Sequence, residues 1–167
     1  QAIIRANSRE PYKVLGDLRA QVIANEVSAQ RLIETLEEFK LDNIDDISTH
    51  ITAASEEAMR NAIGALADGC YRNELRSDGF DEPIRLKAAL TVKGREMSID
   101  FSGSSPASQR AINVCLNFTK AYAFFAVKAA LVPEVPNNDG SFRPIVVTAP
   151  KGSILNAEFP MPTVARH

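Results

Sequence analysis

Residues 84–101 read IRLKAALTVKGREMSIDF, and the spacing of their apolar residues decides the fold class. Apolar side chains occupy every second position from Ile84 to Val92 and again from Met97 to Phe101. A period of two places one side of an extended chain against a core. Gly94 stands between the two runs and can adopt the positive φ that a tight turn needs. The stretch therefore predicts an antiparallel β-hairpin with one buried face.

Two long helical segments precede this hairpin. Apolar residues recur at intervals of three and four over residues 11–40 and again over residues 43–67, a spacing typical of amphipathic helices. Pro11 suits the first turn of the first helix, and the Asp68-Gly69 pair suits the end of the second. Because only a few residues separate the two segments, we expect them to pair as a long antiparallel helical hairpin.

The rest of the chain adds one helix and short strands. The charged, glycine-containing segment 71–82 is typical of a loop. Residues 117–131 predict a helix that is apolar nearly all round and therefore central. Short C-terminal strands are expected at 143–148 and 153–156. This order of elements indicates an α+β fold. The predicted parts are a helical hairpin region, residues 1–70, and an α+β region, residues 71–167, both within one larger domain.

Composition and charge exclude several classes of function. The 167 residues carry 19 Lys and Arg against 21 Asp and Glu, and no basic stripe suggests a nucleic-acid partner. No apolar run reaches the roughly 18 residues of a membrane span, so no membrane association is expected. The two cysteines are too few for a disulfide scaffold and suit a reducing compartment, which favours a cytoplasmic location.

The sequence contains no catalytic motif of known mechanism. It has no phosphate-binding loop, no His-Glu-x-x-His pair and no nucleophile elbow, so the catalytic residues stay unknown. Its two histidines and two cysteines are dispersed, and we expect no metal site made by this chain itself. The chain begins and ends without the polar tails of a complete protein, which predicts that it is a piece of a longer one.

Three polar segments stand out, each with a structural alternative. Asp17 lies in a largely apolar helical pattern, where a buried carboxylate needs a partner, and an intramolecular ion pair would supply one. The loop DFSGSS, residues 100–105, offers N–H and hydroxyl groups to an anion, or is an ordinary Ser-Gly turn. The segment VPNNDGSFRP, residues 135–144, concentrates amides, a carboxylate and an arginine, which suits a polar ligand or a structural Asx turn.

These segments resemble motifs of the hydantoinase B/oxoprolinase family. PNNDGSFRPI (136–145), APKGSILN (149–156) and FPMPTVAR (159–166) are similar to the family's N-x-G-x-x-R-P-I, a-P-x-G-S-i-l-N and P-x-P-v-x-x-R. GDLRAQ (16–21), DFSGSSP (100–106) and IN (112–113) resemble its G-D-L-x-A-Q, D-F-[ST]-G-T-S-P and I-N. Ser141 and Met161 depart modestly from the pattern. The order and spacing of the motifs match over essentially the whole chain.

The resemblance implies an internal section of a B-type subunit. In the family, an A-type chain uses ATP to activate a cyclic amide such as hydantoin or 5-oxoproline, and the B-type chain contributes to hydrolytic ring opening. The implied partners are a hydantoinase A-type subunit, in a hetero-oligomer, and a small cyclic amide. ATP would act through that partner, and a divalent metal would belong to the parent protein. Related assemblies carboxylate ketones such as acetone. A section of such a carboxylase, or a non-catalytic assembly section, therefore stays open as an alternative.

Six polar residues at motif positions are the implied substrate-binding candidates: Asp17, Gln21, Asp100, Asn113, Asn138 and Arg143. Asparagine and arginine side chains suit the carbonyl and carboxylate groups of a cyclic imide or its N-carbamoyl product. The isolated chain is predicted to be inactive, because it has neither a phosphate-binding loop nor a recognisable base–nucleophile pair.

Overall fold

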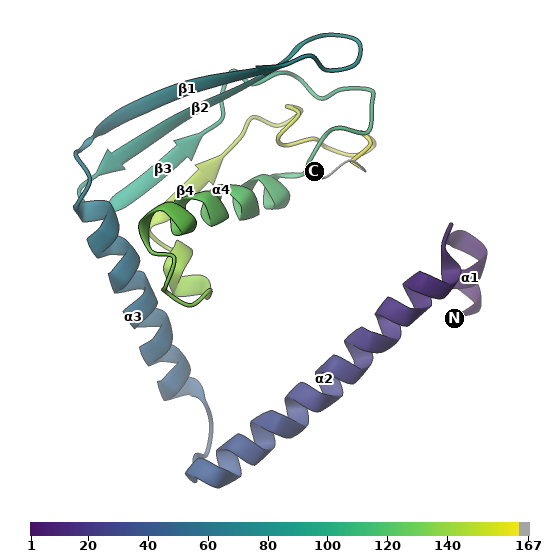
Figure 1. Ribbon diagram of the computed structural model, residues 1–167, viewed down its shortest axis with the longest axis vertical. Helices are drawn as coiled ribbons and strands as arrows, with labels where there is room; N and C mark the ends of the chain where they lie inside the picture. The colour runs from purple at the N-terminus through teal and green to yellow at the C-terminus, as the bar shows by residue number, and fades with distance from the viewer. Residues whose placement is uncertain (164–167) are drawn as a thin grey trace. The chain divides into compact units, whose positions relative to one another are not determined.

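The structure is a computed structural model that describes residues 1–163, and the chain forms two compact units, residues 1–48 and residues 49 onward. The first unit contains α1 (Ala2–Asn7) and α2 (Pro11–Phe39) (Figure 1). The predicted first helix is confirmed. It starts with Pro11 and ends before Lys40, which adopts the left-handed helical conformation. The backbone N–H groups that cap this end donate to the carbonyls of Leu36 and Glu37. Leu15 is buried, whereas most of the apolar face of α2 is exposed within this chain.

The second unit is built on a four-stranded sheet of order β1-β2-β3-β4. Its strands are β1 (Gly69–Ser77), β2 (Ile84–Lys93), β3 (Glu96–Asp100) and β4 (Ile145–Thr148). The predicted hairpin is confirmed as the antiparallel pair β2–β3, with Lys93 opposite Glu96 and Gly94 at a φ of 59°. β4 joins β3 in parallel, which confirms the first of the two predicted C-terminal strands.

Two expectations for the strands of this unit are wrong. The segment 71–82 is not all loop, because β1 occupies its first half and pairs with β2 along nine residues. β1 lies at the edge of the sheet with nearly all its side chains exposed, so it shows no apolar alternation. The strand expected at 153–156 is absent among the described residues. Ser153 there forms only isolated bridges, to Pro106 and Asn156, in a tight turn that follows Gly152 at a φ of 76°.

The core lies between the sheet, α3 (Asp45–Gly64) and α4 (Leu116–Leu131), which runs along one face of the sheet (Figure 1). It comprises Met59 and Ile63 of α3, Val127 of α4, and Val92, Met97, Ile99, Ile145 and Val147 of the sheet. α4 confirms the helix predicted over 117–131, but it is not central. Tyr122 is 58% exposed and Phe125 is 69% exposed, because only one side of this helix meets the sheet.

The predicted helix over 43–67 is confirmed as α3, while its packing against α2 as a hairpin stays a prediction. The helical region expected over residues 1–70 crosses the boundary between the two units. The reason is that the second half of α3 places Met59 and Ile63 in the core of the sheet. Membership of one larger domain stays a prediction. No helix of residues 1–163 is long and apolar enough to cross a membrane.

Candidate functional site

A tight turn at residues 138–143 docks against the side of α3. The turn contains the short 3-10 helix Asp139–Phe142. The Asn138 amide nitrogen donates to Ser55 Oγ at 2.7 Å, and the fully buried Ser141 donates its hydroxyl to the Pro136 carbonyl at 3.0 Å. Gly140 lies so close to the carbonyl of Thr52 that a Cβ at this position would clash with it. The close approach explains the glycine in the motif.

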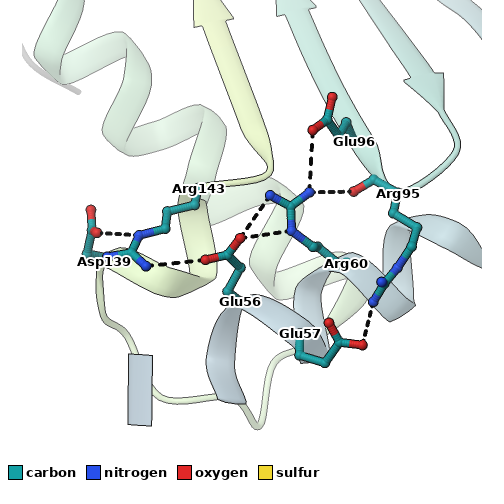
Figure 2. Close-up of polar contacts among 7 residues, drawn as sticks. All are labelled: Glu56, Glu57, Arg60, Arg95, Glu96, Asp139 and Arg143. Atoms are coloured by element: carbon teal, nitrogen blue, oxygen red, sulfur yellow. Dashed lines mark hydrogen bonds and ion pairs between the residues drawn. The ribbon is translucent and has the colours of Figure 1, made fainter. Parts of the chain in front are cut away.

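Ion pairs fasten the same turn to the helix, as Figure 2 shows. Arg143 donates from Nε to Asp139 Oδ2 at 2.8 Å and from Nη1 to Glu56 Oε2 at 3.3 Å. The other oxygen of Glu56 accepts from Arg60 Nε at 2.9 Å. The hydrogen bond from Arg60, helped by the one from Arg143, holds the pKa of Glu56 below its ordinary value. Asp139, and then Glu56, raise the pKa of Arg143. Glu56 is therefore a carboxylate shared between helix and turn.

The network continues from α3 to the β2–β3 turn (Figure 2). Arg60 Nη1 lies 3.5 Å from Glu96 Oε1 and 3.5 Å from the carbonyl oxygen of Arg95. Arg95 in turn donates from Nη2 to Glu57 Oε1 at 2.6 Å. Exposed ion pairs such as Arg95 with Glu57 contribute only about 0–1 kcal/mol each. The exposed part of the network therefore acts mainly by fixing the geometry of the turn.

Arg143 is not a free cation in this arrangement. Two carboxylates already match its charge, although its side chain is 49% exposed. The geometry therefore favours a positioning role, and substrate contact by Arg143 stays a prediction. Asn138 differs, because its buried Oδ1 has no hydrogen-bond partner among the described residues. Buried polar atoms in proteins are nearly always paired, so this oxygen is a candidate acceptor for a bound molecule or water.

Asp100 lies at the other end of the β3–β4 pair, opposite Thr148. Its Oδ1 accepts from Ser102 Oγ at 2.8 Å, from Ser102 N at 3.1 Å and from Thr148 Oγ1 at 3.3 Å. The Ser102 hydroxyl contributes most to lowering the pKa of this carboxyl. The N–H and hydroxyl of Ser102 are thus used within the turn instead of facing an anion. The structural alternative holds for Ser102, while the Asp100 carboxylate itself is partly exposed.

The other three candidates are Asn113, Asp17 and Gln21. Asn113 is fully buried; its Oδ1 accepts from Ser108 N at 2.7 Å, and its Nδ2 donates to the carbonyls of Ser108, Arg110 and Pro162. This pattern favours a structural role. Asp17 and Gln21 lie on α2, in the first unit, and are exposed, so the expected burial of Asp17 is wrong. Because Asp17 is exposed, its side chain needs no partner within the chain. Substrate contact by these residues stays a prediction.

Sequence reasoning missed Glu56 and Arg60, the partners of the turn. Their separation of four residues is the spacing at which opposite charges pair on a helix, and this signal was available. The link from Glu56 to Arg143 spans 87 residues and has no local signature.

The described residues contain no donor set for a metal. Among residues 1–163, no group of three or more His, Cys, Asp and Glu side chains gathers in a way that could hold an ion. The divalent metal implied for the parent protein does not fit these residues.

The chain is similar to known proteins along its whole length. All 167 residues match the family model described as Hydantoinase B/oxoprolinase. The B chain of a putative D-/L-hydantoinase from a Pseudomonas species is 35% identical, over 98% of this chain and 30% of that protein. A 5-oxoprolinase from Dictyostelium discoideum is 29% identical, over 91% of this chain and 12% of that protein. The crystal structure of the ATP-dependent caprolactamase from Pseudomonas jessenii superposes with a TM-score of 0.77 at 27% identity, over 95% of this chain and 28% of that one. The chain thus spans less than a third of these relatives.

Proposed function

This chain belongs to the hydantoinase B/oxoprolinase family, and from that premise we propose that it is a section of the B-type subunit of an ATP-dependent cyclic-amide hydrolase. The observation that carries the proposal is the match of the family model to every residue of the chain. The names of the relatives support it, because hydantoin, 5-oxoproline and caprolactam are all cyclic amides. The proposed reaction is hydrolytic opening of a ring such as hydantoin or 5-oxoproline.

The reaction needs an activated carbonyl, which this section does not supply. Water adds to the carbonyl carbon, the ring C–N bond breaks, and the departing nitrogen takes up a proton. An unactivated amide is a poor electrophile, and the sequence has no phosphate-binding loop with which to use ATP. We therefore assign ATP to a hydantoinase A-type partner in a hetero-oligomer. The hydantoinase relative and a caprolactamase relative are each named as one subunit of an enzyme, which supports assembly with other chains.

Within this section, the residues around the 138–143 turn act by position. Glu56 and Arg143 hold the turn on α3, and the close approach of Gly140 to Thr52 fixes its depth. That placement leaves the buried Asn138 Oδ1 without a hydrogen-bond partner among residues 1–163. An amide oxygen is a hydrogen-bond acceptor, which suits an N–H of a cyclic amide. Asp100 is the second candidate for contact, since its carboxylate is anionic and partly exposed.

The test is a product assay on the full-length parent with its A-type partner. Ring-opened product is measured for hydantoin and 5-oxoproline with and without ATP, beside the isolated chain under the same conditions. We expect turnover only in the complete, ATP-containing mixture. Turnover by the isolated chain would overturn the dependence on a partner. A complete mixture that leaves both rings closed but consumes acetone and bicarbonate would identify the ketone carboxylase instead.

A non-catalytic assembly role predicts a different outcome. Replacing Asn138 by Ala in the parent would then leave turnover unchanged when all of the parent chain is bound to the A-type partner. The proposal expects turnover to fall while co-purification with the A-type chain is retained.

A further inference from the structure

The face of the sheet turned away from α4 carries a hollow of about 580 Å³ over β1 and β2. The register of the strands sets Arg72, Ala89, Asp100 and Thr148 in one row across the sheet. Residues directly opposite one another on neighbouring strands point to the same face. Ala89 lines the bottom of the hollow, and its short side chain leaves this space open. Arg72 lines it on one side, and on the other lies Ser102, which is bonded to Asp100.

Most charges around the hollow are already paired. Glu74 accepts from Arg76 Nε at 2.8 Å and lies 3.4 Å from Lys87 Nζ; these partners, Arg76 above all, hold its pKa below its ordinary value. The aliphatic part of the Lys87 side chain lies close to Gly103. A Cβ on Gly103, at a φ of 87°, would lie 3.1 Å from Lys87 Cδ. Arg72 differs, because no hydrogen bond or ion pair within residues 1–163 engages its guanidinium.

Asp100 lies on the other side of Ala89 from Arg72, and hydrogen bonds hold its carboxylate in place. Asp100 is held through Oδ1 alone, by Ser102 and Thr148, and no hydrogen bond in the described part of the chain uses its second oxygen. Adjacent strands are about 4.8 Å apart, so the backbones of Arg72 and Asp100 are about 10 Å apart, two strand spacings. The hollow above this row, about 580 Å³, is large enough for one small molecule.

We propose that this hollow, together with Asp100 next to its Ser102 edge, binds a small ligand that carries a carboxylate for Arg72 and an N–H donor for Asp100. A guanidinium recognises a carboxylate with two parallel hydrogen bonds, and a carboxylate oxygen accepts from an amide or ammonium N–H. A cyclic amide that bears a carboxylate, such as 5-oxoproline, meets both requirements, as does the amino acid released by opening its ring. Caprolactam has the amide but no carboxylate. The proposal rests on the proposed function only for the choice of a cyclic amide.

The test is titration of the 167-residue chain, labelled with nitrogen-15, with 5-oxoproline, caprolactam or acetate. We expect 5-oxoproline to shift the amide signals of Arg72, Ala89 and Ser102 and to bind at least tenfold more tightly than the other two. Acetate supplies only the carboxylate and caprolactam only the amide. Binding of all three with equal affinity, or no binding of 5-oxoproline, would overturn the proposal.

Variants separate the two halves of the site. Arg72→Gln should weaken 5-oxoproline binding at least tenfold. Lys93→Gln, which removes the same charge from an exposed position on β2, should change it less than twofold. Asp100→Asn should remove the preference for 5-oxoproline over acetate. The amide spectrum of each variant reports whether the sheet is intact. Unchanged affinity in Arg72→Gln would refute the site.

The outcome is distinguishable from that of the proposed function. If the assembled parent opens 5-oxoproline but Arg72→Gln leaves its KM unchanged, the ligand site is wrong and the hydrolase stands. If the chain binds 5-oxoproline through Arg72 but the complete mixture opens no ring, the ligand site stands and the hydrolase is wrong.

Discussion

Replacing Gly140 by Ala should dislodge the 138–143 turn from α3. A Cβ at this position would overlap the carbonyl of Thr52, and the nearest atoms on that side also include the Thr52 carbonyl carbon and Cγ2. The main obstacle is backbone within a helix, so a side-chain rotation cannot relieve it. The backbone of Gly140 itself imposes no penalty on alanine, because its φ is not positive. The whole cost therefore comes from overpacking.

Overpacking a buried contact costs about 1–3 kcal/mol, and we expect the upper end because backbone stands on both sides. A loss of about 3 kcal/mol lowers the melting temperature of a chain this long by roughly 6–12 °C. The assay is calorimetric unfolding, combined with hydrogen exchange at the Ser141 N–H, which donates to the Asn138 carbonyl. That N–H should exchange faster in the variant.

Gly16→Ala is the matched control. Gly16 lies within α2 with nothing within 4 Å of its added Cβ, so alanine should stabilise the helix by about 0.5–1 kcal/mol. An unchanged melting temperature in Gly140→Ala, together with unchanged hydrogen exchange at the Ser141 N–H, would refute the proposed clash.

Two further changes test the site. Glu56→Gln should flatten the acid limb of the stability curve. The pKa of Glu56 in the folded protein lies below its ordinary 4.5, so its contribution to the free energy of unfolding is present above pH 4.5 and is lost as the pH falls through the lower folded value. Urea unfolding from about pH 3 to about pH 7 measures this contribution. An equal dependence of stability on pH in both proteins would contradict it. Asn113→Ala should destabilise the second unit by about 1–3 kcal/mol, since it leaves the Ser108 N–H and three carbonyls without their partner; calorimetry that finds no loss would count against its structural role.

Elements with a clear apolar period could be predicted from the sequence. The alternation from Ile84 to Phe101 predicted β2 and β3, and the helical spacing after Pro11 predicted α2. β1 could not be found in this way, because an edge strand with exposed faces needs no apolar alternation. Its partner, β2, determines its structure through the backbone ladder.

The candidate site was only partly accessible to sequence reasoning. The motifs identified Asn138 and Arg143 as polar residues in an apolar setting, but they did not predict which residues these two side chains contact. Arg143 meets Glu56 from 87 positions away, and the Asn113 amide is engaged by backbone groups that carry no side-chain signature. Arg72 was not a candidate, because its lack of a partner within residues 1–163 depends on how β1, β2 and the 102–105 loop come together. Such contacts follow from the tertiary fold.

The proposed hydrolase function is tested most directly by ATP-dependent ring opening with the full-length parent and its A-type partner, measured as ring-opened product and ADP in the same reaction. We expect product and ADP together in the complete mixture, no product when either chain or ATP is omitted, and reduced product in a parent carrying Gly140→Ala. Ring opening without ATP, or equal turnover by the Gly140→Ala parent with its turn displaced, would contradict it.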